Sequence, residues 1–114
     1  VICWMALDDA TEDNGCMRFI PGSHKAGVTE HKHLEDFRVE DADFDYQREA
    51  AVPLKAGGCS FHHSLALHRT DVNSSSERRI GLTVAYMSAT SKYVGKDPKP
   101  EFEQAVGKSY EGCV

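Results

Sequence analysis

Short apolar runs that end at turn-forming residues constrain this sequence more than any other feature. Residues 1–7 form a nearly continuous apolar run with β-branched and aromatic side chains, which is typical of a buried strand. Residues 16–20 form a second run, which ends at Pro21. The Asn14-Gly15 pair between the two runs is the strongest short hairpin signal. The first quarter of the chain is therefore predicted to be a hairpin of two antiparallel strands.

The rest of the chain also predicts short strands, separated by polar loops. Residues 59–68 predict one or two strands, and residues 79–87 predict the clearest strand after the first. Residues 24–50 are charged and follow neither a strand nor a helix period, which predicts a long surface loop. From residue 88 onward the chain is polar and is expected to form a tail. Short strands without a long helix predict an all-β sandwich or jelly roll. About five strands can be counted against the eight of a jelly roll, so the fold is expected to be incomplete.

Composition narrows the possible partners. The chain has 114 residues and a net charge of -5, and its basic residues are scattered among acidic ones, which argues against nucleic acid as a partner. No apolar run approaches the length of about 18 residues that spans a membrane. The four cysteines show no C-x-x-C spacing and lie mostly in apolar stretches, so we expect reduced, structural cysteines and a cytoplasmic location.

One pair of residues suggests chemistry. His68 ends an expected strand, and Arg79 begins the next one after a polar loop. In a narrow β-barrel, adjacent strands would direct both side chains into one cavity. Imidazole is a good ligand for iron(II) or zinc, and a guanidinium pairs with a carboxylate in bidentate fashion. The pair therefore suits a metal and a dicarboxylic acid bound side by side, but a lone histidine near a strand end is more often a packed or surface residue, and an arginine at a strand edge is usually solvated.

Two longer blocks carry a resemblance to a known family. The first block spans residues 4–25 and has two specific cores, Asn14-Gly15-Cys16-Met17 and Pro21-Gly22-Ser23-His24-Lys25. The second block contains Ala56-Gly57-Gly58, Phe61-His62-His63, His68, Asn73 and Arg78-Arg79. In this order and separation, the blocks resemble the phytanoyl-CoA dioxygenase family of iron(II)/2-oxoglutarate-dependent oxygenases. The resemblance implies a double-stranded β-helix, or jelly roll. Residues 1–90 would be the C-terminal part of the oxygenase domain, and residues 91–114 a polar tail.

The resemblance also implies roles for individual residues. His68 resembles the distal histidine of the two-histidine, one-carboxylate triad that holds iron(II). Arg79 resembles the arginine that pairs with the far carboxylate of 2-oxoglutarate, and Arg78 is the alternative if the register shifts by one. Thr70 matches a hydroxyl that assists co-substrate binding. Trp4 matches a tryptophan that lines the same pocket, with a core aromatic as an equal alternative. The intact enzyme would use iron(II) and 2-oxoglutarate to hydroxylate a small-molecule or acyl substrate.

The sequence departs from the family pattern at the metal. The family's first histidine and its carboxylate form an H-x-D or H-x-E motif on the strand before the tryptophan, and this motif does not occur ahead of Trp4. The His31-Lys32-His33 triplet lies after that strand, has no carboxylate and is expected to be solvated. Two of three iron ligands are therefore absent, and the chain as given is expected to be an inactive fragment. A smaller departure is Gly58, which stands where many relatives carry an acidic residue.

Two other functions compete with the oxygenase. The first is a non-catalytic jelly-roll module that forms a homo-oligomer through an open sheet edge at residues 1–7. The second is a cupin-like metal-binding domain that uses His62, His63 and His68. Because His62 and His63 alternate along a strand, at most one of them is expected to point inward. His24 is expected to stabilise its turn or to lie at the pocket rim.

Overall fold

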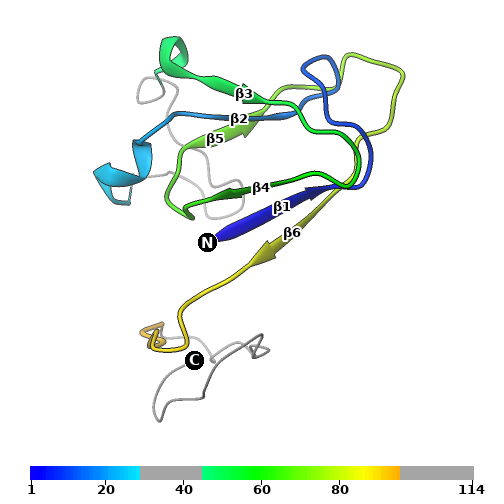
Figure 1. Cartoon of the computed structure of the whole chain (residues 1–114). Helices are drawn as coiled ribbons and strands as arrows, with labels where there is room; N and C mark the ends of the chain where they lie inside the picture. Colours follow the sequence, from blue (N-terminus) through cyan, green and yellow to red (C-terminus); the bar gives the residue numbers. More distant parts are fainter. Residues whose placement is uncertain (29–44, 96–114) are drawn as a thin grey trace.

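The computed structural model describes residues 1–28 and 45–95 (Figure 1). Within these ranges the regular structure is β-strand apart from two short 3-10 helices, η1 (Ser23–Ala26) and η3 (Tyr46–Arg48). None of the described helices is long and apolar enough to cross a membrane. Most of the predicted surface loop (29–44) and most of the predicted tail (96–114) lie outside the described residues.

The first sheet has β1 (Ile2–Ala6) at its centre. It lies between β4 (Cys59–His62) and β6 (Gly81–Ala85), and both pairings are antiparallel. Because successive side chains of a strand point to opposite faces of the sheet, each of these three strands contributes side chains to both faces. Trp4 stands directly opposite Ser60 on one side and Thr83 on the other, so these three side chains share one face.

The second sheet has β2 (Met17–Phe19) at its centre. Its neighbours are β3 (Ala50–Val52) and β5 (His68–Thr70), again both antiparallel. Figure 1 shows the two sheets as the two layers of a sandwich. The register places Phe19 opposite His68 and Met17 opposite Thr70. His68 and Thr70 of β5, the two predicted site residues on that strand, therefore share a face with the apolar side chains of β2.

The predicted hairpin at the start of the chain is wrong. Its two strands form, but β1 and β2 belong to different sheets and do not pair. The segment between them connects one sheet to the other, and the Asn14 side chain stabilises it. The Asn14 amide nitrogen donates to the Asp9 carbonyl at 2.8 Å, and the Asn14 amide oxygen accepts from the Thr11 N–H at 2.7 Å. Gly15 has a φ of 84°, a left-handed conformation that favours glycine. The Asn-Gly pair thus makes the turn that its chemistry predicts, within a connection between sheets.

The N-terminal strand is not an open edge of its sheet, so the structure does not provide the exposed edge from which association through residues 1–7 was predicted, and the association itself stays a prediction. β1 pairs on both sides, and its pairing with β6 extends beyond the strand, where Tyr86 N–H donates to the Val1 carbonyl at 2.8 Å. The edges in the described part of the chain are β4 and β6 in one sheet, and β3 and β5 in the other.

The apolar core lies between the two sheets. It contains a cluster of five buried residues from β1, β2 and the segment between them: Trp4, Ala6, Ala10, Cys16 and Met17. Small side chains at 6 and 10 leave room for the indole, which is only 6% exposed. The cysteines that the structure describes, Cys3, Cys16 and Cys59, are free, and Cys3 and Cys16 are buried whereas Cys59 is exposed. The core therefore supplies a wall on which the candidate site is built.

Candidate functional site

His68 points from the second sheet toward the first. Its ring lies 5.6 Å from the Phe19 ring in the same sheet and 5.2 Å from the His62 ring of β4 in the opposite sheet. Its Nδ1 is 2.8 Å from the Ala66 carbonyl oxygen. Because the His68 side chain is exposed although it faces the sandwich interior, this end of the inter-sheet space is open to solvent. His68 is therefore placed where an external molecule can reach it.

His62 is the inward member of the His62–His63 pair. Its ring centroid is 4.8 Å from that of Phe19, across the gap between the sheets. Burial lowers the pKa of His62, and the adjacent His68 lowers it further, so the imidazole favours its neutral form. His63 points away and stacks on His24 at 5.2 Å. The expected alternation of the two histidines is confirmed.

Arg79 and Trp4 meet at the other side of the same space. The guanidinium carbon lies 5.8 Å from the centre of the indole ring. Two glycines allow this arrangement. A Cβ at Gly81 would overlap the indole, and a Cβ at Gly15 would lie 3.8 Å from Arg79 Nε and 2.5 Å from the Asp71 carbonyl oxygen. Arg79 is thus half-buried between an aromatic face and a closely packed turn.

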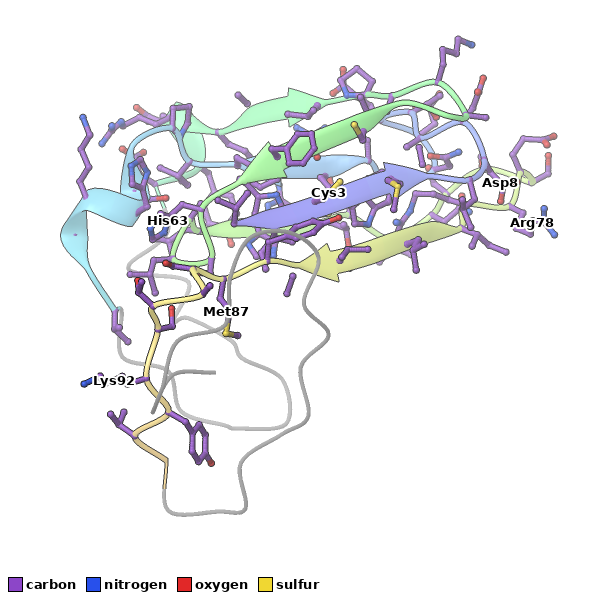
Figure 2. All side chains as sticks on the ribbon, turned by 60° about the horizontal axis from the view of Figure 1, so that its bottom comes forward. Cys3, Asp8, His63, Arg78, Met87 and Lys92 are labelled. Carbon is purple, nitrogen blue, oxygen red and sulfur yellow. The ribbon has the colours of Figure 1, made fainter. Side chains whose placement is uncertain are left out.

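The pairing of the arginines separates Arg79 from its neighbours. Arg18 and Arg69 each bind carboxylates in the second sheet. Arg78 donates two hydrogen bonds of 2.9 Å to the Asp8 carboxylate. Figure 2 shows this pair at the end of the sandwich away from His63. Arg79 has no hydrogen bond or ion pair with any residue in the described part of the chain. Its guanidinium is therefore available to an external anion, whereas that of Arg78 is occupied.

The predicted site residues are brought together only in part. Trp4 and Arg79 are in contact, and His68 and Thr70 line the inner face of the opposite sheet. No ring contact, ion pair or hydrogen bond joins His68 to Arg79. The expectation that the two come from adjoining strands is wrong, because β5 and β6 belong to different sheets. Both side chains nevertheless face the space between the sheets, since the partners of each, His62 and Trp4, project inward from the first sheet.

The described residues do not complete a metal centre. Among them there is no group of three or more histidine, cysteine, aspartate or glutamate side chains placed to hold an ion. The cupin-like cluster of His62, His63 and His68 is not assembled, because His63 faces away from the other two. His31 and His33 lie outside the described residues. Two inward imidazoles, His68 and His62, lie near each other, but the described residues do not provide the third ligand that a centre of two histidines and a carboxylate needs.

Ser60 is a residue that sequence reasoning did not single out. It precedes His62 by two positions on β4 and therefore shares its inward face. Its Oγ and the Nδ1 of His62 are both buried without a hydrogen-bond partner in the described structure. An unpaired buried polar atom costs about 1–3 kcal/mol. The strand period could have identified Ser60 once His62 was known to point inward.

Comparison with known proteins gives a consistent result. A model of the phytanoyl-CoA dioxygenase (PhyH) family matches residues 1–81. Phytanoyl-CoA dioxygenase domain-containing protein 1 of Danio rerio is 37% identical over 84 residues, which cover 67% of this chain and 29% of the relative. Phytanoyl-CoA dioxygenase 1 of Oryza sativa subsp. japonica is 35% identical over 88 residues, which cover 71% of this chain and 30% of the relative. The chain thus spans about a third of the length of the curated relatives that it matches.

Solved structures agree with the sequence matches. EvdO2 from Micromonospora carbonacea var. aurantiaca, complexed with 2-oxoglutarate, superposes with a TM-score of 0.70 and 29% identity, over 85% of this chain and 41% of that one. The non-heme alpha ketoglutarate dependent carbocyclase SnoK superposes with a TM-score of 0.65 and 35% identity, over 81% and 37%. The predicted fold class, an all-β jelly roll, is confirmed. The paired sheets, the matched motifs and these likenesses together show that the chain belongs to the phytanoyl-CoA dioxygenase family.

Proposed function

We propose that this chain forms the co-substrate-binding part of an iron(II)/2-oxoglutarate-dependent dioxygenase that hydroxylates a small-molecule or acyl substrate. The observation that carries the proposal is Arg79, a half-buried guanidinium without a carboxylate partner among the described residues. Such a group matches one carboxylate of a dicarboxylic acid in charge and in shape. The likeness to EvdO2, whose structure was determined with 2-oxoglutarate, supports the choice of diacid.

The described residues would act by binding and by excluding water. Arg79 would hold the far carboxylate, and the Trp4 indole beneath it would replace solvent on one side, which strengthens the charge pairing. Thr70, opposite Met17 on the inner face, would supply a hydroxyl hydrogen bond. His68 would stand at the end of this space where the family pattern assigns a metal ligand. Because the described residues do not complete an iron centre, we propose that this chain by itself does not turn over substrate.

The two neighbouring arginines provide the test. Arg79→Gln should weaken 2-oxoglutarate binding by about tenfold or more, since it removes a charge-assisted pair in a partly buried place. Arg78→Gln is the matched control and should change affinity less than twofold, because Arg78 is occupied by Asp8. Isothermal titration on metal-free protein measures both. Equal effects of the two substitutions would refute the proposed role of Arg79.

The histidine on β5 can be tested without turnover. Wild-type protein should bind less than one equivalent of iron(II) under anaerobic conditions, and His68→Ala should lower this further, because His68 is the metal ligand that the family pattern assigns to this chain. Metal analysis after gel filtration measures the stoichiometry. Iron bound at one equivalent in both proteins would show that His68 is not a ligand.

Self-association is a second candidate function, and the outer face of the first sheet favours it. This face is apolar across all three strands, and its members include Cys3, Met5, Phe61, Leu82 and Val84. Phe61 is 66% exposed and Leu82 is 49% exposed, and exposed apolar faces are common association sites. We propose a homo-oligomer through this face, in the cytoplasm. Phe61→Lys should then shift the mass measured by analytical ultracentrifugation toward the monomer, and a wild-type monomer at high concentration would refute it.

A further inference from the structure

The Pro21-Gly22-Ser23-His24 motif forms a tight turn at the end of β2. The Ser23 N–H donates to the Ile20 carbonyl at 3.2 Å, and Gly22 has a φ of 81° and a ψ of -4°. These are the angles of the third residue of a type II turn, where glycine is favoured, and proline suits the position before it. The motif therefore turns the chain out of the sheet immediately after Ile20.

The Ser23 hydroxyl continues the hydrogen-bond ladder that this turn interrupts. The Ile20 N–H donates to the Leu67 carbonyl at 3.0 Å, next to the last paired residues of β2 and β5. The Ile20 carbonyl accepts from the Ser23 N–H, and the Leu67 N–H donates to Ser23 Oγ at 2.8 Å in a part-buried place. A side-chain oxygen thus serves as the acceptor for the residue immediately before His68.

A second contact joins η1 to the same part of the chain. Residues 63–67, which we call the β4–β5 connection, form a turn in which the Ala66 N–H donates to the His63 carbonyl at 2.9 Å. The His63 ring stacks on the His24 ring at 5.2 Å, and Figure 2 shows His63 at the η1 end of the sandwich. The β4–β5 connection is therefore held on η1 at both of its ends, by His24 at the start and by Ser23 at the finish.

The β4–β5 connection sets the direction of the His68 ring. The His68 Nδ1–H donates to the Ala66 carbonyl at 2.8 Å, and Ala66 is the neighbour of Leu67, whose N–H is bound by Ser23. The ring also lies 5.6 Å from the Phe19 ring, inside the space between the sheets. A movement of the β4–β5 connection would displace the Ala66 carbonyl, and the His68 ring would turn with it.

We propose that Ser23 is a positioning residue, whose hydroxyl fixes the end of the β4–β5 connection and thereby directs the His68 imidazole into the space between the sheets. The proposal rests on the proposed function, in which His68 is a residue of the site. Ser23 acts through Leu67 and Ala66 rather than by touching a ligand. It gives the Pro21-Gly22-Ser23-His24 motif a single purpose: two residues make the turn, and two hold the connection that carries His68.

Nuclear magnetic resonance of metal-free protein reads the direction of the His68 ring. Phe19 and His62 lie close enough to shift the signals of its ring protons, and the spectrum of His68→Ala identifies those signals. Ser23→Ala should move or broaden them, and Ser23→Thr should keep the wild-type position because it retains the hydroxyl. The indole N–H signal of Trp4 should be unchanged in both variants, since the indole packs in the core.

Hydrogen exchange measures the hydrogen bond itself. The Leu67 N–H should exchange about tenfold faster in Ser23→Ala than in the wild type, and at close to the wild-type rate in Ser23→Thr. If Ser23→Ala does not fold, Ser23→Cys takes its place, because a thiol is a weak acceptor and should give a smaller change of the same kind.

Ser74 provides the matched control. Its hydroxyl also bonds to backbone, since it donates to the Asp13 carbonyl at 2.9 Å, but it lies in the loop between β5 and β6. Ser74→Ala therefore removes one hydrogen bond of the same type elsewhere in the fold. It should change neither the exchange of the Leu67 N–H nor the signals of the His68 ring.

The outcomes separate this inference from the function on which it rests. If Ser23→Ala speeds the exchange of Leu67 but leaves the His68 signals in place, the hydroxyl holds only backbone and the inference is overturned. The inference is also overturned if Ser74→Ala moves those signals as much as Ser23→Ala does. In both cases the proposed function stands as long as Arg79→Gln weakens 2-oxoglutarate. If Arg79→Gln leaves 2-oxoglutarate unaffected, the proposed function fails, whatever the His68 signals show.

Discussion

The two faces of the sheet β3-β2-β5 satisfy their polar groups in opposite ways. On the outward face, Arg18 and Arg69 are cross-strand partners, and like charges placed so would repel each other. Two carboxylates offset this repulsion, because Glu49 and Asp71 each form ion pairs with both guanidiniums. On the inward face, the same strand β5 carries His68 and Thr70 without an ion pair among the described residues.

This difference between the two faces shows which polar groups the chain pairs internally and which it does not. The outward network is a structural device, because every guanidinium in it has a carboxylate from the same chain. On the inward side, Arg79, Ser60 Oγ and His62 Nδ1 have no hydrogen-bond or ion-pair partner among the described residues. Charges that a chain satisfies internally contribute to its fold, and groups that it leaves unpaired in a sheltered place are those that a ligand can use.

Removing Glu49 should have the largest effect on stability. Its carboxylate is only 6% exposed, and Glu49→Ala would leave Arg18 and Arg69 facing each other across β2 and β5. We expect a loss of about 3 kcal/mol in the free energy of unfolding, measured by urea denaturation. Affinity for 2-oxoglutarate per folded molecule should not change, because the network lies on the outward face.

Glu12 provides the control for this prediction. Its carboxylate binds Arg18 at 2.8 Å but is 61% exposed. Glu12→Gln should therefore cost about 0.5 kcal/mol or less. If Glu12→Gln and Glu49→Ala cost the same, burial does not distinguish the two carboxylates, and the outward network is not the structural device described above.

Much of the strand content could be predicted from the sequence, but the assignment of strands to sheets could not. The apolar runs at 1–7 and 16–20 contain β1 and β2, because alternation and turn residues are local signals. Pairing is a long-range property: β1 pairs with strands that lie more than 50 residues later, at Cys59–His62 and Gly81–Ala85. The Asn14-Gly15 turn predicts a local reversal equally well whether the chain returns to the same sheet or crosses to the other.

The candidate site likewise contains some residues that the sequence predicts and others that only the three-dimensional structure identifies. The motif match placed Trp4 and Arg79 together before any geometry was known, and the structure brings them into contact. It could not show that Asp8 occupies Arg78, since that pair depends on how the ends of β1 and β6 meet. Nor could it identify Ser60, because a serine in a strand is uninformative until the inward face is known.

Gly15 tests how closely the inward side of the site is packed. Its φ is 84°, and a Cβ there would lie 2.5 Å from the Asp71 carbonyl oxygen. Gly57 has a φ of 85° with no atom within 4 Å of its Cβ position, so Gly57→Ala isolates the cost of the left-handed conformation, about 1 kcal/mol. Gly15→Ala should cost about 2 kcal/mol in all, because it adds a clash with backbone. Equal costs in thermal unfolding would show that the turn beside Arg79 can relax.

Acid titration should give the smallest effect and should distinguish the two neighbouring arginines. Hydrogen bonds from Arg78 hold the pKa of Asp8 below its ordinary value of 3.8. The stability from this carboxylate is therefore fully present above pH 3.8 and is lost as the pH falls through the lower folded-state pKa. The difference in unfolding free energy between wild type and Asp8→Asn should be constant near neutral pH and close in acid. Arg79→Gln should leave the acid dependence of stability unchanged, since no described carboxylate pairs with Arg79. A parallel loss in both variants would mean that Arg79 also has an internal partner, and the contrast between an occupied and an available guanidinium would fail.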